Sequence, residues 1–110
     1  MHIDQSPEAF ARALLPLAGR VSFAVATERL PSPSKVQRWR DALLELTPRL
    51  DEEYWPADFL EIERRGAVAL VLIQALSLTN GPVGAEELTL IDGALERAMY
   101  LLTHDDWTTP

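Results

Sequence analysis

A run of 13 uncharged residues, 66–78, constrains the fold of this 110-residue chain more than any other feature. Gln74 and Ser77 carry its only polar side chains. A helix that is apolar on every face has to be covered by other segments, so the run predicts a central core helix. It is shorter than the roughly 20 residues that span a bilayer, so no membrane span is predicted here.

A strand over residues 68–73 stays open as an alternative, because a short apolar run does not distinguish a buried strand from a buried helix. The Ala and Leu content of the run and the helical pattern that precedes it favour the helix. At the other end, Asn80, Gly81 and Pro82 predict a stop, with Asn80 or Gly81 in a left-handed cap.

Three further segments with helical periodicity predict the helices that cover this run. The first begins at Ser6 and Pro7, extends to about residue 29, and is kinked or split at Pro16, which lacks a backbone donor. The second follows the breaker at residues 30–34 and spans about 33–50, with Ser32 or Ser34 as its cap. Its apolar stripe comprises Val36, Trp39, Leu43, Leu46 and Leu50. The last spans 85–103, with a stripe of Leu88, Ile91, Leu95, Ala98 and Leu102.

These elements predict an all-α protein, a compact four- to five-helix bundle around a central apolar helix at about 58–79. Its length fits one domain over residues 1–110, with short flexible ends at 1–5 and 105–110. Gln74 would then be a buried amide, which costs about 1–3 kcal/mol unless it finds a hydrogen-bond partner. The small residues Gly66, Ala67 and Ala69 allow close helix approach. Because three neighbours hardly cover such a helix, we expect a homodimer.

Charge and composition exclude several classes of protein. The formal net charge is −7, with positive charge concentrated in residues 1–40 and negative charge after them. Such an acidic balance disfavours general affinity for nucleic acid or anionic membranes, and it favours a partner with a basic surface. The absence of cysteine excludes disulfides and thiolate zinc sites. The N-terminal residues lack the features of a signal peptide, so we expect a cytoplasmic protein.

No catalytic, cofactor or metal motif stands out. Asp92 and Glu96 share a helix face and could hold a divalent ion with a substrate phosphate, although a solvated acidic face explains them as well. Leu101 stands where a Glu-x-x-His motif ending at His104 would need a glutamate. We therefore expect no cofactor and no metal, and keep a metal- or phosphate-handling enzyme as a third hypothesis.

The basic residues Arg29, Lys35, Arg38 and Arg40 form a possible basic surface without an intervening acid. Arginine and lysine beside an aromatic ring can bind phosphates and stack on bases, so a nucleic-acid-associated helical protein is the alternative function. Trp39 lies among them but belongs to the apolar stripe of its helix, which predicts a core position instead.

The acidic and aromatic segment with Glu52, Glu53, Tyr54 and Trp55 is the predicted partner-binding site, because tyrosine and tryptophan are enriched at binding hot spots. A packed lid over the core is the alternative for both rings. The leading prediction is a small, acidic, non-enzymatic protein-binding module: an inhibitor, an immunity-type protein or a regulatory adaptor.

Overall fold

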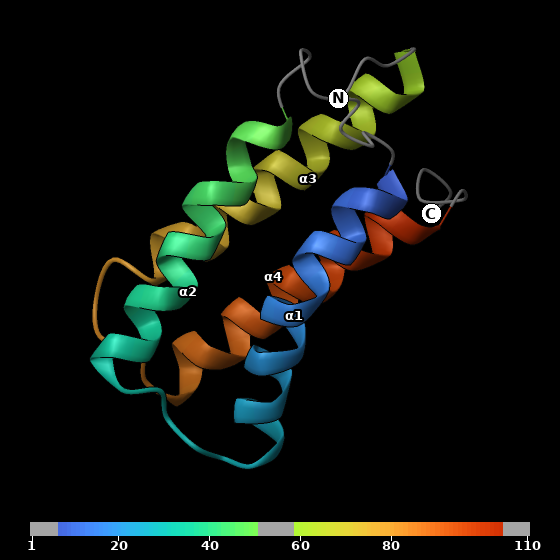
Figure 1. Cartoon of the computed structure of the whole chain (residues 1–110). Coiled ribbons are helices and arrows are strands. Elements are labelled where there is room, and N and C mark those ends of the chain that lie inside the picture. The colour runs from blue at the N-terminus through green and yellow to red at the C-terminus, as the bar shows by residue number, and fades with distance from the viewer. Residues whose placement is uncertain (1–6, 51–58, 105–110) are drawn as a thin grey trace.

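A computed structural model, which describes residues 7–50 and 59–104, has an all-α fold. Within these residues the chain forms four α-helices and one short 3₁₀ helix. They are α1 (Pro7–Ala26), α2 (Pro33–Leu46), the 3₁₀ helix η1 (Thr47–Leu50), α3 (Phe59–Leu78) and α4 (Ala85–Thr103). Figure 1 shows how the α-helices lie relative to one another. The predicted helical bundle is confirmed, and the open alternative of a strand at residues 68–73 is wrong because those residues lie within α3.

The helix boundaries follow local capping chemistry closely. The Ser32 hydroxyl accepts a hydrogen bond from the backbone N–H of Lys35 at 3.2 Å, and Pro33 occupies the first turn. Pro48 follows the end of α2, where the chain tightens into η1 and keeps Leu50 buried. The stripe predicted for residues 36–50 is buried at every position.

The first helix is continuous through Pro16, so the predicted split does not occur. Pro16 itself is exposed, and the buried side of α1 comprises Phe10, Ala11, Leu14, Leu17, Val21 and Ala24. Among the described residues, α1 alone is long and apolar enough to cross a membrane, a property that helices of soluble cores share.

The helix at the centre of the bundle is α4, which packs extensively on both α1 and α3. Its buried residues include the predicted stripe, and Leu95 and Ala98 have no exposed surface. The predicted bundle with an apolar helix at about 58–79 is confirmed, but that helix, α3, is not enclosed on every side. An apolar composition alone therefore does not bury every side of a helix, as the exposed Leu70 and Ile73 of α3 show.

Only one side of α3 is buried. Val68, Leu72 and Ala75 have no exposed surface, whereas Leu70 is 66% exposed and Ile73 is 51% exposed. Gln74 is also exposed, so the expectation of a buried amide in need of a partner is wrong. Its amide can be hydrated at no comparable cost.

The turn after α3 differs from the predicted left-handed cap. No described glycine has a positive φ, and the backbone N–H groups of Thr79 and Asn80 bond back three residues instead. The Arg40 guanidinium donates to the side-chain oxygen of Asn80, which connects α2 to this turn. Left-handed backbone occurs after α1, where Glu28 has φ 55°.

Candidate binding groove between α1 and α2

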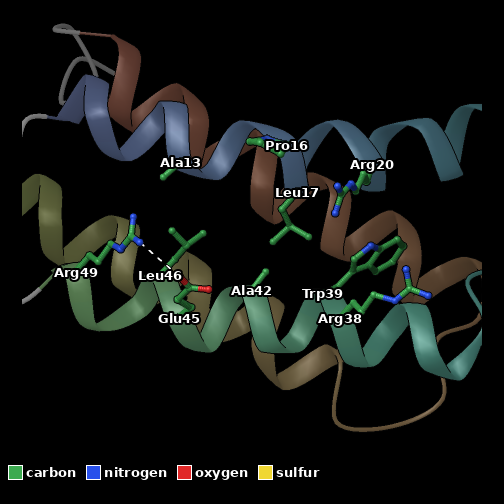
Figure 2. Close-up of a pocket in the computed structure, with 10 residues that line it drawn as sticks. All are labelled: Ala13, Pro16, Leu17, Arg20, Arg38, Trp39, Ala42, Glu45, Leu46 and Arg49. Atoms are coloured by element: carbon green, nitrogen blue, oxygen red, sulfur yellow. Dashed lines mark ion pairs between the residues drawn. The ribbon is translucent and has the colours of Figure 1, made fainter. Parts of the chain in front are cut away.

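The α1–α2 groove is the feature of the described surface that combines a hollow with distinctive chemistry. It consists of two adjoining cavities of about 230 and 580 Å³, which share Pro16, Arg20, Arg38 and Trp39. Figure 2 shows α1 and α2 running along opposite sides of the smaller cavity, with side chains from each helix directed toward the other. The groove is lined by Ala13, Pro16, Leu17, Gly19, Arg20, Phe23, Lys35, Arg38, Trp39, Ala42, Glu45, Leu46 and Arg49.

Small side chains explain why the seam between these two helices is open. Ala13 and Gly19 on α1 and Ala42 on α2 face the groove, and none of them can reach across it. The contact between α1 and α2 is correspondingly slight compared with that between α1 and α4. A groove with helical walls therefore follows from the residues that line it.

The apolar part of the groove has a packed base and a solvent-exposed end. Trp39 is only 2% exposed and Leu17 is 5% exposed, so both belong to the core while their edges reach the cavity. The prediction that Trp39 is a core residue is confirmed. Phe23 is 66% exposed and lines the larger cavity. An exposed phenylalanine beside a hollow offers apolar surface to a ligand.

Three cations surround this apolar surface. Arg20, Lys35 and Arg38 are exposed, and their side chains have no ion-pair or hydrogen-bond partner within residues 7–50 and 59–104. Arg20 comes from α1, and the other two come from α2. Fixed positive groups without intramolecular partners remain available to an anionic ligand.

The fourth cation in the groove is partly neutralised. Arg49 lies 3.6 Å from the Glu45 carboxylate, and both side chains are substantially exposed. Exposed pairs of this kind contribute roughly 0–1 kcal/mol, so the pair can open when a ligand arrives. Among the described residues, Glu45 is the only acid that lines either cavity.

The predicted basic surface maps onto the groove only in part. Lys35 and Arg38 line it, whereas Arg29 lies exposed in the loop after α1 and Arg40 bonds to Asn80. Arg20 and Arg49 line the groove but were absent from the predicted set. The signal in the sequence was the spacing of Pro16, Leu17, Gly19, Arg20 and Phe23, which share one side of a helix.

The predicted partner-binding segment lies outside the described residues. Glu52, Glu53, Tyr54 and Trp55 all fall in the gap between η1 and α3. Their proposed role at an interface stays a prediction, as does the alternative of a packed lid.

The acidic pair of α4 lies away from the groove. Burial, and then the neighbouring charge of Glu96, raises the pKa of Asp92 above its usual range. One carboxylate oxygen of Asp92, Oδ1, is buried without a hydrogen-bond partner in the described part of the chain. No group of three potential metal ligands occurs among the described residues. Burial and a like charge on the same helix therefore account for the raised pKa of Asp92.

Asp92→Asn should stabilise the protein at neutral pH. The raised pKa means that the folded chain favours the protonated carboxyl, a contribution present below the ordinary value of 3.8 and lost as the pH rises through the folded-state pKa. Removing the charge should add at least roughly 0.2–0.5 kcal/mol, the cost of like charges four residues apart on a helix, because the burial penalty on the charged carboxylate is removed with it. Urea denaturation at neutral and acid pH measures the effect.

The gain from Asp92→Asn should disappear at a pH below 3.8, where the wild-type carboxyl is protonated in both states. Glu96→Gln, which removes the second cause of the raised pKa, should reproduce part of the gain. An advantage of Asp92→Asn that is equal at both pH values would contradict the electrostatic explanation.

Comparison with known proteins finds no similar protein. No family model, curated protein or solved structure matches it. Its function has to be inferred from the groove and the surface of the molecule.

Proposed function

We propose that the protein is a small, non-enzymatic protein-binding module, of the inhibitor, immunity or regulatory adaptor type, and that it binds its partner in the α1–α2 groove. The observation that carries this proposal is the combination of an apolar hollow with three cations, Arg20, Lys35 and Arg38, that have no partner among the described residues. Trp39 and Leu17 form the base, Phe23 is exposed at one end, and Arg20 and Arg38 flank them. Aromatic and arginine side chains are enriched at the core of protein interfaces, and tryptophan, tyrosine and arginine dominate their energetic hot spots.

The chemistry of the groove supports binding. Its polar side chains are guanidinium groups, one ammonium group and one carboxylate, which orient a ligand and compensate its charge. The pair with a perturbed pKa, Asp92 and Glu96, is on α4 and does not line the groove. Binding through rigid helices also requires little reorganisation, which reduces the entropic cost of association.

A photo-crosslinking amino acid in place of Phe23 tests the location of the site. In host extract, we expect one partner protein to be crosslinked from position 23. The matched control carries the same amino acid in place of Leu90, which is 52% exposed on α4 and outside the groove. If a partner is crosslinked from position 90 and none from position 23, the interface does not lie in the groove. No captured protein from either position would remove the proposed function.

Nucleic acid binding is the second candidate, and one observation favours it. Phe23 supplies the exposed aromatic ring that the basic segment alone lacked, and it lies in the same cavity as Lys35 and Arg38. Bases stack on such rings while cations bind the phosphates. The net charge of −7 opposes a polyanion. Absence of a mobility shift at low salt, where phosphate contacts are strongest, would exclude this candidate.

We also propose that the protein forms a homodimer through α3. Gly66, Leu70, Ile73 and Ser77 form an exposed, uncharged stripe along one side of that helix. Burial of such apolar surface stabilises association by about 25 cal/mol per Å² before the entropic cost of binding.

Light scattering coupled to size exclusion should give twice the chain mass of 12.3 kDa at micromolar concentration. Ile73→Asp should convert the dimer to a monomer because it places two like charges in the interface. Leu90→Asp, at a similarly exposed position on α4, should leave the dimer intact. A monomeric wild type would remove the proposal.

For localisation, we propose the cytoplasm. The apolar window of α1 carries Arg20 in its interior, and an arginine at the centre of a membrane-spanning helix costs about 2.5–3.5 kcal/mol on insertion scales. Its apolar residues instead pack on α4. Recovery of a tagged chain in the membrane fraction after cell lysis would contradict this proposal.

A further inference from the structure

We infer that the occupant of the α1–α2 groove is an acidic, amphipathic helix of the partner protein. This inference rests on the proposed function and specifies the chemistry of the bound segment. It starts from a difference in charge: the chain as a whole carries −7, yet the described residues that line the groove include four cations and a single acid. Since Arg20, Lys35 and Arg38 have no described intramolecular partner, their positive charges can attract an anionic ligand in the groove.

The arrangement of charge and apolar surface defines the pattern that a ligand needs. Arg20 lies on one wall and Arg38 on the other, with Trp39 between them at the base (Figure 2). A complementary ligand therefore has an apolar ridge flanked on both sides by carboxylates. A helix with leucines at i, i+3, i+4 and i+7 and glutamates beside them presents this pattern.

The length of the groove fits a short helix. Along α1 its lining runs from Ala13 to Phe23, ten residues apart, which corresponds to about 15 Å at 1.5 Å per residue. A partner helix of about ten residues, close to three turns, covers this length. The small residues Ala13, Gly19 and Ala42 let its backbone approach closely.

The walls of the groove favour a helix over an extended peptide. Both walls are α-helices, whose interior backbone groups are already bonded, so they offer no strand edge with which an extended peptide could pair. A helical ligand satisfies its own backbone hydrogen bonds and needs only side-chain contacts. The net charge of −7 opposes a polyanion, and Trp39 is too deeply buried for a base to stack on its ring, so the groove favours a protein ligand over a nucleic acid.

The test uses the intact chain and a synthetic probe. The probe is a fluorescent peptide of about ten to fifteen residues, long enough for three to four turns, with leucines at helical spacing and glutamates on both flanks. Anisotropy measures its affinity, and amide chemical shifts of the labelled protein locate its site. We expect shifts centred on Arg20, Phe23, Arg38 and Trp39, and an affinity that falls as salt is added.

Three control ligands separate the alternatives. A scrambled peptide of identical composition should bind roughly tenfold more weakly or not at all, because its apolar ridge is lost. A peptide with lysine in place of every glutamate should not bind. A thymidine oligonucleotide should also fail to compete, and tighter binding of the oligonucleotide than of the acidic peptide would overturn the inference in favour of nucleic acid.

Charge reversal in the protein tests the same contacts from the other side. The double variant Arg20→Glu/Arg38→Glu should weaken acidic-peptide binding roughly tenfold or more, and Arg20→Gln/Arg38→Gln should have an intermediate effect. Arg29→Glu removes an exposed cation outside the groove and should leave the affinity nearly unchanged. Helical circular dichroism confirms that each variant is folded before binding is compared.

The outcomes distinguish this inference from the proposed function. A native partner crosslinked through position 23 without any binding of the acidic peptide would reject the acidic helix while the groove stays the binding site. Equal weakening by Arg29→Glu and by the double variant would also reject it, since the attraction would then be general. A failure to crosslink any partner would reject the proposed function itself.

Discussion

Leu95→Ala should lower the free energy of unfolding by about 3 kcal/mol, within the range of roughly 2–5 kcal/mol observed for leucine truncations in packed cores. Leu95 has no exposed surface and lies on α4, the helix that packs on both α1 and α3. Its truncation leaves a cavity in the hydrophobic core, on the helix that forms the two largest helix interfaces. Urea denaturation followed by circular dichroism measures the loss as a lower midpoint with an unchanged slope.

Leu90→Ala provides the matched control on the same helix. Leu90 is 52% exposed, so its truncation should change the free energy of unfolding by no more than about 0.5 kcal/mol. Both substitutions have the same effect on helix propensity, and the difference between them isolates burial. Similar losses in the two variants would contradict a bundle centred on α4.

The same comparison applies to α3 and addresses the sequence prediction directly. If α3 were enclosed on every side, Leu70→Ala and Leu72→Ala would cost similar amounts. Leu72 has no exposed surface and Leu70 is 66% exposed, so only Leu72→Ala should be strongly destabilising in the dilute, monomeric protein. Any additional loss in Leu70→Ala at high concentration would come from the proposed dimer.

Local signals in the sequence predicted the helices well. Ser32 and Pro33 begin α2, and Ala85 and Thr103 bound α4 as predicted, because caps, prolines and apolar spacing act within a few residues. The identity of the central helix depends on contacts between distant segments. Residues 66–78 are more uniformly apolar than α4, yet α4 has two large neighbours and α3 exposes one side.

The groove could be predicted only in part for the same reason. Lys35 and Arg38 were visible as cations in a segment without acids, and Trp39 as a core residue. Arg20 and Phe23 belong to a different helix, and only the α1–α2 hairpin brings them beside that segment. Hydropathy did not single out Phe23, because a phenylalanine in an apolar helix is usually buried.

Phe23→Ala and Trp39→Ala should separate binding from folding, because the two rings lie in the same cavity with opposite exposures. Phe23 is 66% exposed, so Phe23→Ala should change the free energy of unfolding by no more than about 0.5 kcal/mol. Trp39 is 2% exposed, and Trp39→Ala should cost about 3–5 kcal/mol of stability.

Phe23→Ala, which should hardly change stability, should strongly weaken the affinity for the partner. As an aromatic hot spot, Phe23 should contribute about 2 kcal/mol, so Phe23→Ala should weaken capture of the partner roughly 30-fold at unchanged stability. Calorimetric titration of the crosslinked partner, once purified, measures this loss, and Leu15→Ala, exposed on α1 outside the groove, is the control. If Phe23→Ala binds the partner with full affinity, the partner does not contact Phe23, and the groove is not the interface. If Phe23→Ala lowers the affinity for the partner and Leu15→Ala does not, then α1 binds the partner through the side that faces the groove. Its other, buried side packs on α4.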